Sequence, residues 1–389
     1  MNKKIINTPY FLIDTNQLDD LLEDMKNSLY SFWINGIIGY SFKTNNLRSV
    51  ISYMKSKGLY AEVVSSDEYL LAKQCKYPID QIIFNGPAKR KKEFIEAAEN
   101  GAFVNLETKR ELRWLLDCNK EALKKSKLGI RINFCIEDYC PNESQCGEED
   151  GRFGFSYESG ELEEAILFFK EHKIKISGIH LHCSSKTRSL NIYKAISEVA
   201  LKVIKEYSLD LNYIDVGGGF FGGVEGKPTF KGYFDTIYKI LSKDIDFTKT
   251  NIIIEPGMSL IGASMNYVTS VIDVKKTKNN TFAVLDGSRI HIDPLMRKSM
   301  YTYDIIRKEN NLVNSKVDQI LCGFTCMEND RFFKISDFML NENDQIIFKK
   351  VGAYTISLSP QFIELHPDVY ILKDGQLELV QSRKEIENF

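Results

Sequence analysis

Apolar and polar residues alternate along the first two thirds of the chain with the periods of helices and strands. Leucine or methionine residues at 18, 21, 22, 25 and 29 lie on one face of a predicted helix over residues 15–30. Eight short apolar runs then alternate with amphipathic stretches. The runs cover residues 37–43, 60–65, 81–85, 102–106, 128–134, 177–183, 212–216 and 251–255. Repeated βα units of this kind predict a parallel sheet.

Eight consecutive βα units favour an α/β fold in which the strands close into a (β/α)8 TIM-like barrel. A doubly wound open sheet is the alternative. After about residue 265 the pattern changes to β-rich runs joined by polar turns, with no long amphipathic helix between them. We therefore predict a barrel domain over residues 1–265 and a mostly antiparallel C-terminal β domain over residues 266–389. Residues 8–14 are a candidate strand that pairs with the β domain.

Composition and charge narrow the class of protein. The chain has 389 residues, 51 Lys and Arg against 53 Asp and Glu, and a formal net charge of −2. Electrostatics therefore give no reason to expect nucleic acid or an anionic membrane surface as a partner. No window approaches the roughly 18 apolar residues of a spanning helix, and the N-terminus does not have the pattern of a secretory signal. The eight cysteines are scattered without a paired CxxC pattern, which predicts a reducing, cytoplasmic compartment and no metal site.

Candidate catalytic residues lie where the predicted barrel strands end, because that end of a barrel carries the active site. Lys43 follows the first run, and it is either a solvated strand end or a desolvated lysine that forms a Schiff base. His180 and His182 share one face of the sixth run, and Ser185 follows. We expect His182, nearer the end of the strand, to bind a ligand and His180 to serve mainly in local packing.

The last two predicted strands lead into a glycine-rich turn and a buried acid. Gly217, Gly218 and Gly219 follow the seventh run, where backbone N–H groups of a barrel commonly bind phosphate. Glu255 ends the eighth run and faces inward like Ile253, so it needs a partner such as a positively charged ring nitrogen. An imine-forming lysine, an imidazole, a phosphate site and a carboxylate for a pyridinium nitrogen together predict pyridoxal 5′-phosphate.

Nine short motifs along nearly the whole chain are similar to those of one enzyme family. They are YSFKTN at 40–45, VVSSDE at 63–68, FNGPAK at 84–89, RFGF at 152–155, GIHLHCSS at 178–185, DVGGGF at 215–220, EPG at 255–257, CGFTCMEND at 322–330 and GAY at 352–354. With these motifs in this order, the chain resembles the fold-type III pyridoxal-phosphate decarboxylases, the group of diaminopimelate, ornithine, arginine and carboxynorspermidine decarboxylases. The resemblance implies an alanine-racemase-like barrel followed by a β domain.

The resemblance also implies a role for each matching position. Lys43 corresponds to the Schiff-base lysine, His182 to the imidazole stacked on the cofactor ring, and Glu255 to the carboxylate at the ring nitrogen. Cys326 matches the acid–base cysteine that reaches into the neighbouring subunit, which implies a homodimer with shared active sites. The remaining cofactor contacts, mainly to the phosphate, are implied for Ser185, Gly217, Gly218, Gly219, Gly257 and Tyr354.

Positions expected to touch the substrate depart from the family pattern. Met258 stands where the family has an arginine after EPG, and Met327 stands where an acidic residue follows the cysteine. Asp293 stands where an arginine often meets a distal carboxylate, and Glu328 completes this predicted substrate shell. We therefore expect a larger or modified amino acid, from polyamine, siderophore or other specialised metabolism, rather than lysine, ornithine or diaminopimelate.

The predicted activity is α-decarboxylation of an amino acid or carboxylated amine, through a Schiff base at Lys43 and a quinonoid carbanion. A racemase or epimerase on the same barrel is the alternative, and Glu255 disfavours it because an arginine at the ring nitrogen characterises alanine racemases. A cofactor carrier without catalysis would lack the C-terminal β domain. A purely structural protein would have no need of Lys43, His182, Glu255 and Cys326 together.

Overall fold

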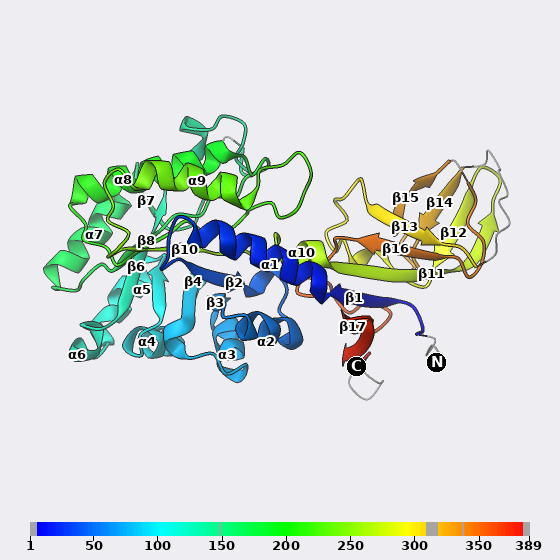
Figure 1. The fold of residues 1–389 in the computed structure, drawn as a ribbon, viewed down its shortest axis with the longest axis horizontal. Coiled ribbons are helices and arrows are strands. Elements are labelled where there is room, and N and C mark those ends of the chain that lie inside the picture. The colour runs from blue at the N-terminus through cyan, green and yellow to red at the C-terminus, as the bar shows by residue number, and fades with distance from the viewer. Residues whose placement is uncertain (1–5, 148, 309–317, 337, 384–389) are drawn as a thin grey trace. The chain divides into compact units, whose positions relative to one another are not determined.

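A computed structural model of the chain describes residues 6–147, 149–308, 318–336 and 338–383. The chain divides into two compact units (Figure 1). One unit extends from Leu21 to Ser259, and the other combines the N-terminal segment up to Asp20 with the chain from Leu260 onward. The first unit contains a parallel sheet, and the second contains a mostly antiparallel sheet.

Eight parallel strands of the first unit close into a barrel. They are β2 (Ile37–Ser41), β3 (Tyr60–Ser65), β4 (Ile82–Ala88), β5 (Phe103–Leu106), β6 (Lys127–Asn133), β8 (Gly178–His180), β9 (Tyr213–Asp215) and β10 (Asn251–Ile254). Their order is β5-β4-β3-β2-β10-β9-β8-β6, and β5 pairs with β6 to close the ring. A two-residue strand, β7 (Phe155–Ser156), extends the pairing beside β6. The barrel and the separate sheet confirm the predicted fold class, and the doubly wound alternative is wrong.

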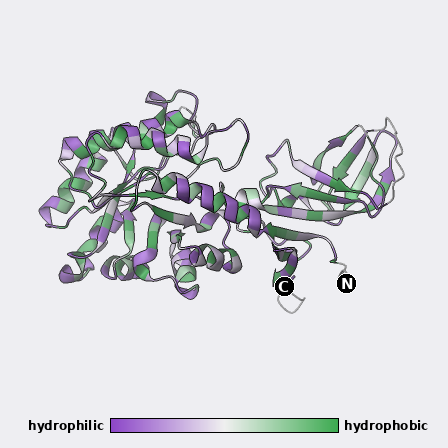
Figure 2. Cartoon of the chain, in the orientation of Figure 1, coloured by the Kyte–Doolittle hydropathy of each residue, from purple (hydrophilic) through white to green (hydrophobic). Residues whose placement is uncertain are grey.

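Helices surround the barrel strands (Figure 1). They are α1 (Thr15–Tyr30), α2 (Arg48–Ser56), α3 (Ser66–Gln74), α4 (Lys91–Glu99), α5 (Lys109–Trp114), α6 (Lys120–Leu123), α7 (Glu161–Glu171), α8 (Leu190–Tyr207) and α9 (Phe230–Leu241). Hydrophobic and hydrophilic residues alternate along them (Figure 2), and in α8 the buried Ile192, Ile196, Val199 and Val203 recur at helical spacing. Among the described residues, no helix is long and apolar enough to cross a membrane.

Local sequence signals explain where α3 begins. Ser65 caps the helix, since its hydroxyl accepts a hydrogen bond from the N–H of Glu68 at 3.2 Å. The Glu68 carboxylate in turn accepts from the N–H of Val64 at 2.8 Å. This arrangement resembles a capping box, except that Glu68 accepts from the residue before the cap, and the Ser-x-x-Glu spacing of the VVSSDE motif encodes it. The motif thereby fixes the turn that follows β3.

Tyr213 on β9 fills part of the barrel interior. The ring is fully buried and packs with Phe103 and Ile253. Its hydroxyl donates a hydrogen bond to Asn105 Oδ1 at 2.8 Å. Gly178 on the adjacent β8 leaves the space for this ring, because a Cβ at that position would lie 2.3 Å from the Tyr213 ring. The glycine and the tyrosine are therefore one packing unit.

The second unit is built around a nine-stranded sheet. Its strands are β1 (Tyr10–Asp14), β11 (Met265–Lys276), β12 (Thr281–Leu285), β13 (Thr302–Ile306), β14 (Gln319–Cys322), β15 (Arg331–Ile335), β16 (Gln345–Lys349), β17 (Asp368–Lys373) and β18 (Gln376–Gln381). The main path is β15-β14-β12-β11-β1-β17-β18, and β16 pairs with β11 and β13. β1 lies between two strands from the other end of the chain, antiparallel to β11 and parallel to β17. A short helix, α10 (Ile261–Ser264), precedes β11.

Single 3₁₀ turns complete the described structure. They lie at Phe42–Thr44, Ile79–Gln81, Leu115–Asp117, Ile136–Asp138 and Arg289–His291. The turn at Leu115–Asp117 directly follows α5, whose α-helical part ends at Trp114. The turn after β2 contains Lys43 and therefore sets the position of the lysine predicted to bind the cofactor.

We predict that Gly178→Ala destabilises the barrel, because the added Cβ has no space beside the Tyr213 ring. Overpacking of this kind costs about 1–3 kcal/mol in the free energy of unfolding, which urea denaturation measures. Gly232→Ala in α9 is the matched control: its Cβ would lie 3.4 Å from Thr229 Oγ1, and alanine stabilises a helix by about 0.5–1 kcal/mol relative to glycine. Equal stability of Gly178→Ala and the unmodified protein would contradict the packing argument.

Candidate active site

Lys43 lies in the 3₁₀ turn that directly follows β2. Its Nζ is 3.0 Å from Oε2 of Glu62, a fully buried carboxylate on β3. The other oxygen of Glu62 accepts a hydrogen bond from the amide of Asn85 on β4 at 3.1 Å. A buried carboxylate requires such partners, so Glu62 and Asn85 hold the lysine amine at the mouth of the barrel.

His182 lies two residues beyond the end of β8, and its ring is fixed by the glycine turn. The N–H of Gly218 donates to Nδ1 at 3.2 Å, which leaves the ring proton on Nε2. Burial, with the positive charges of Arg131 and Lys43, lowers the pKa of His182 to about 3. The imidazole is therefore neutral near pH 7.

Arg131 on β6 supports the same segment from the neighbouring strand. Its Nη1 lies 3.0 Å from both carboxylate oxygens of Glu107, and its Nη2 donates to the backbone oxygen of His182 at 3.4 Å. Burial alone would raise the pKa of Glu107, but the positive charges of Arg131 and Lys89 lie close by and lower it. A buried ion pair thus holds the backbone at His182 in place.

The glycine turn after β9 is packed so closely that no side chain fits. Gly217 and Gly219 have φ angles of 70° and 95°, in the left-handed region that glycine adopts without strain. A Cβ on Gly217 would lie 2.5 Å from His182 Nδ1, and a Cβ on Gly218 would lie 2.1 Å from the backbone oxygen of Glu255. The turn therefore presents backbone without side chains, the form that an anion-binding turn takes.

The turn after β10 is equally close to the turn that carries Lys43. A Cβ on Gly257 would lie 2.1 Å from Thr44 Oγ1, and the N–H of Ser41 donates to the backbone oxygen of Pro256 at 3.1 Å. Met258 follows and is partly buried. The ends of β2, β9 and β10 thus meet within the barrel unit, as the predicted cofactor site requires.

Ser185 lies in the segment between β8 and α8. Its Oγ accepts a hydrogen bond from the N–H of Arg188 at 2.9 Å. The backbone oxygen of Arg188 accepts from the hydroxyl of Tyr233 at 2.6 Å, and the same hydroxyl accepts from the N–H of Phe221 at 3.4 Å. These bonds connect the Ser185 segment with the chain just beyond the glycine turn.

Glu255 directly follows β10 and is only 4% exposed. Asn85 donates to its Oε1, His180 Nε2 lies 3.6 Å from its Oε2, and its carboxylate is hydrogen-bonded to that of Asp215. Burial alone would raise the pKa of Glu255, but His180, Lys43 and the hydrogen bond with Asp215 more than offset it and hold the pKa below its ordinary value. Burial and the nearby Glu255 raise the pKa of Asp215, so Asp215 keeps its proton.

The segment with Cys326 belongs to the second unit and is held by a buried acid. The Asp330 carboxylate accepts hydrogen bonds from Ser288 Oγ at 3.0 Å, from the N–H of Arg289 at 2.9 Å and from Thr325 Oγ1 at 2.6 Å. The side chain of Cys326 itself is exposed. The structure therefore anchors the segment and leaves the thiol accessible within this unit.

Asp293 and Glu328, predicted for the substrate shell, already have partners inside the second unit. The Asp293 carboxylate accepts from Arg289 Nε at 2.9 Å and from the hydroxyl of Tyr301 at 3.1 Å. Burial alone would raise the pKa of Asp293, but these and backbone hydrogen bonds lower it. Glu328 is exposed and pairs with Arg331 at 2.8 Å.

Tyr354 and Met327 are the remaining predicted site residues of this unit. Tyr354 has a φ of 55° and is 39% exposed, an unusual backbone conformation for a bulky residue. Gly352 of the same motif leaves room for the backbone oxygen of Ile261, which a Cβ would approach to 2.1 Å. Met327 is partly buried. The cofactor and substrate roles of the second-unit residues stay predictions.

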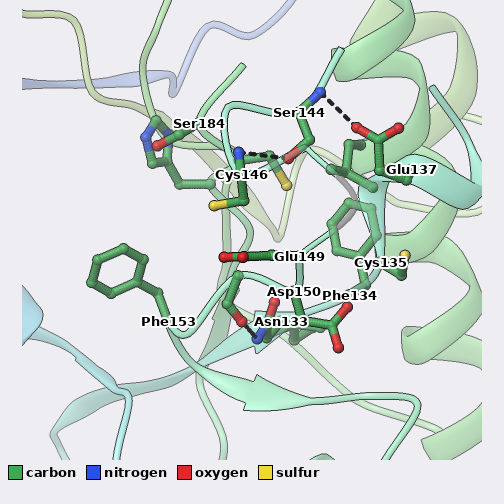
Figure 3. A pocket seen from close by; sticks show the side chains of 15 residues that line it. Asn133, Phe134, Cys135, Glu137, Ser144, Cys146, Glu149, Asp150, Phe153 and Ser184 are labelled. Carbon is green, nitrogen blue, oxygen red and sulfur yellow. Dashed lines mark hydrogen bonds between the residues drawn. The ribbon is translucent and has the colours of Figure 1, made fainter. Parts of the chain in front are cut away.

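A hollow lies beside His182 within the barrel unit (Figure 3). The loop after β6 forms most of its wall. Phe134 and Phe153 contribute aromatic surface, and Glu149 and Asp150 contribute carboxylates. The hollow therefore combines apolar and negatively charged surface next to the predicted cofactor imidazole.

Hydrogen bonds within and next to this loop define the hollow. The N–H of Ser144 donates to a Glu137 carboxylate oxygen at 2.9 Å, and the N–H of Cys146 donates to Ser144 Oγ at 3.1 Å (Figure 3). The N–H of Gln145 donates to the backbone oxygen of Ser184 at 3.1 Å. The loop after β6 is thus attached to the segment that carries His182 and Ser185.

Sequence reasoning missed several residues of the barrel site. Glu62, Asn85, Arg131 and Asp215 form its buried polar wall, and His180 faces Glu255. Glu62, Arg131 and Asp215 each interrupt an otherwise apolar run, in YAEVV, LGIRI and YIDV. A charged residue inside a buried strand was the signal that could have found them.

Comparisons with known proteins identify the family. The family model described as the pyridoxal binding domain of pyridoxal-dependent decarboxylases matches residues 17–262. Diaminopimelate decarboxylase from Campylobacter jejuni is 26% identical to the chain over 99% of this chain and 96% of the relative. A probable chloroplastic diaminopimelate decarboxylase from rice is 25% identical over 98% of this chain and 79% of the relative.

Solved structures show the same fold. Diaminopimelate decarboxylase from Helicobacter pylori, in complex with L-lysine, matches with a TM-score of 0.82 at 23% identity, over 99% of this chain and 96% of that chain. Lysine/ornithine decarboxylase from Vibrio vulnificus, in complex with cadaverine, matches with a TM-score of 0.76 at 21% identity, over 94% of this chain and 92% of that chain. The family match confirms the predicted resemblance and pyridoxal 5′-phosphate as the cofactor. The site fits this cofactor, because it offers a lysine, a neutral imidazole, a turn without side chains and a buried carboxylate.

We predict that Gly217→Ala weakens cofactor binding, because its Cβ would collide with the His182 ring. Gly226→Ala is the matched control, since Gly226 has the same φ of 70° and no heavy atom within 4 Å of a built Cβ. Both variants therefore carry the left-handed strain of about 1–2 kcal/mol, and only Gly217→Ala disturbs the site. Fluorescence titration of the apoprotein with pyridoxal phosphate measures the affinity. Equal affinities of the two variants would show that the glycine turn is not part of the cofactor site.

Proposed function

The chain belongs to the pyridoxal-dependent decarboxylases, and we propose that it removes the α-carboxylate of a larger or modified amino acid or carboxylated amine. The observation that carries the proposal is the meeting of Lys43, His182 and Glu255 where β2, β8 and β10 end. The charge of Lys43 contributes to the pKa shifts of both His182 and Glu255, so the three side chains lie close to one another. The glycine turn after β9 adjoins His182.

Different barrel residues bind different parts of the cofactor in this proposal. Pyridoxal 5′-phosphate supplies an electron sink for the electron pair left on Cα when carbon dioxide departs. Lys43 Nζ is the covalent attachment point, with Glu62 holding the amine in place beforehand. His182 offers the neutral ring for stacking, and Glu255 offers the anion for the ring nitrogen. Gly217, Gly218 and Gly219 give backbone N–H groups to the phosphate, with Ser185, Gly257 and Tyr354 as its further ligands.

The racemase alternative is not favoured. The relatives that match over nearly the whole chain are decarboxylases, and an acid rather than an arginine occupies the position at the ring nitrogen. Lys43 Nζ and Cys326 Sγ are the two groups that we propose to return a proton to Cα after carbon dioxide has left.

The proposed substrate ends in a cationic group and is larger than lysine. Met258 and Met327 cannot compensate a buried charge, so they suit an apolar stem. The hollow beside His182 provides space for the distal part, and Glu149 and Asp150 provide carboxylates for an amine. The compounds bound in solved relatives, L-lysine and cadaverine, are also amines with a terminal positive charge. Asp293 contributes indirectly, because its carboxylate is already bound to Arg289.

We also propose a homodimer in which Cys326 completes the site of the partner subunit. The exposed thiol and the anchored segment support this proposal, since an acid–base group must be both accessible and held in place. The exposed Glu328 and the neighbouring Met327 then lie on the substrate side of the same segment.

A screen of carboxylated amines tests the activity. We expect the purified protein, loaded with pyridoxal phosphate, to release carbon dioxide from long substrates with a terminal amine, and less from length-matched substrates with a terminal methyl group. Mass spectrometry detects the loss of carbon dioxide. Lys43→Ala is the control and should lose turnover, and borohydride reduction should label Lys43 in the unmodified protein. Preferred turnover of lysine, ornithine or diaminopimelate would contradict the substrate proposal, and label on another lysine would contradict the site.

Complementation tests the shared site. Lys43→Ala and Cys326→Ala chains, each inactive alone, should regain activity when mixed, because one site of each heterodimer receives both intact residues. Free exchange places about half of the dimers in the heterodimeric class, so the expected activity is about one quarter of that of the unmodified protein. Native mass spectrometry confirms that heterodimers have formed. Verified heterodimers without activity would contradict sharing, and full activity of Cys326→Ala alone would remove the catalytic role of the cysteine.

A further inference from the structure

His180 occupies the interior of the barrel and has no obvious packing role that needs an imidazole. The side chain ends β8 and is 1% exposed. In the described part of the chain, neither ring nitrogen has a hydrogen-bond partner, although both are buried. Nε2 lies 3.6 Å from Oε2 of Glu255, which is an electrostatic contact just beyond hydrogen-bond distance. A buried imidazole without partners is costly, so its position next to Glu255 calls for an explanation.

Two carboxylic groups share the space that His180 faces. Asp215 on β9 is hydrogen-bonded to Glu255 through its side chain, and its Oδ1 also accepts from the N–H of Gly217 at 2.9 Å. Like charges this close cannot both stay ionised in a buried site. The proton is on Asp215, as the directions of the two pKa shifts indicate. Glu255 is therefore the anion of the pair.

The proton shared by Asp215 and Glu255 determines whether Glu255 can stabilise a protonated ring nitrogen of the cofactor. An ionised Glu255 stabilises a protonated nitrogen, whereas a neutral Glu255 would not. His180 is buried and its Nε2 lies 3.6 Å from Oε2 of Glu255, so its electrostatic effect favours the anionic form of Glu255. Other charged or titratable groups face this cluster in the described part of the chain: Lys43, Glu62, Glu107, Arg131, His182 and Tyr213.

We propose that His180 is a positioning residue of the cofactor site: together with the neutral carboxyl of Asp215 it keeps Glu255 ionised and aimed at the ring nitrogen. The inference rests on the proposed role of Glu255 as the partner of that nitrogen. It assigns to His180 an electrostatic task in place of the packing task expected from its position along the strand. It also assigns a fixed proton to Asp215, which the DVGGGF motif alone does not reveal.

A bound metal ion is the competing explanation for the same geometry. One ligand atom each from His180, Asp215 and Glu255 lies within 4.8 Å of the others. A cation bound by these three residues would keep both carboxyl groups ionised. It would also take Glu255 as a ligand, so that Glu255 could not pair with a protonated ring nitrogen. Metal analysis of the purified holoprotein separates the two explanations: stoichiometric metal that is lost in His180→Phe would overturn the proposal.

¹⁵N NMR on the holoprotein reports whether the ring nitrogen of the cofactor is protonated. The apoprotein is reconstituted with pyridoxal phosphate labelled with ¹⁵N at the ring nitrogen, whose resonance differs between the protonated and unprotonated states. In His180→Phe we expect the resonance to move toward the unprotonated position and the cofactor to bind about tenfold or more weakly, the effect of losing one interaction with a charged group. His180→Gln, which restores an N–H beside Glu255, should recover most of both properties. Asp215→Asn keeps a neutral hydrogen-bond donor, so its ring-nitrogen resonance and cofactor affinity should be close to those of the unmodified protein. Asp215→Leu removes the donor and should change both properties.

His291→Phe is the matched control, because it replaces another buried histidine by the same residue in the second unit. Thermal unfolding of every variant shows whether it is folded, and His180→Gln keeps the test valid if His180→Phe does not fold. A folded variant series with an unchanged ring-nitrogen resonance would overturn the role of His180. Failure of the unmodified protein to bind the labelled cofactor at Lys43 would instead overturn the proposed function itself.

Discussion

The ionised carboxylate of Glu255, enclosed by barrel strands, is the constraint on which the rest of the site depends. Transfer of an isolated carboxylate from water to a protein interior costs several kcal/mol even after relaxation, so a buried anion persists only among groups that compensate it. Asn85 and His180 supply that compensation from β4 and β8, and Asp215 supplies a hydrogen bond from β9. The groups that stabilise the anion therefore come from strands distant in sequence, which the closed barrel brings together.

Close packing of the strand ends gives the site its second property, a surface of backbone without side chains. The turn after β9 approaches His182 and Glu255, and the turn after β10 approaches Thr44, at distances that exclude any Cβ. Glycine at 217, 218 and 257 is thus required by the neighbouring turns, and the proposed phosphate site would use the backbone N–H groups of the same turns. A side chain at any of these positions would therefore disturb the geometry of the strand ends.

Local features of the fold and the site could be predicted from the sequence, and distant pairings could not. The apolar runs and amphipathic stretches located all eight barrel strands, since each depends only on residues within one element. Lys43 and Glu255 were found because each stands where an apolar run ends. The contact between Asn85 and Glu255 spans 170 positions, and the insertion of β1 between β11 and β17 joins the two ends of the chain. The local pattern associated residues 8–14 with the β domain but did not specify their partner strands, so the strand order of the second sheet and the buried polar wall emerged only from the structure.

The same distinction explains why the sequence indicates the cofactor more clearly than the substrate. The barrel residues proposed to hold the cofactor each stand at or just beyond a strand end that the sequence marks. The residues proposed for the substrate come instead from loops and turns, and one of them, Asp293, is already paired with Arg289. An acidic residue in a motif can bind a ligand only if its own protein leaves it unpaired, and that is a property of three-dimensional contacts. Among the acids proposed for the substrate, Asp293 is paired with Arg289 and Glu328 with Arg331, whereas Glu149 and Asp150 are exposed in a loop that borders His182.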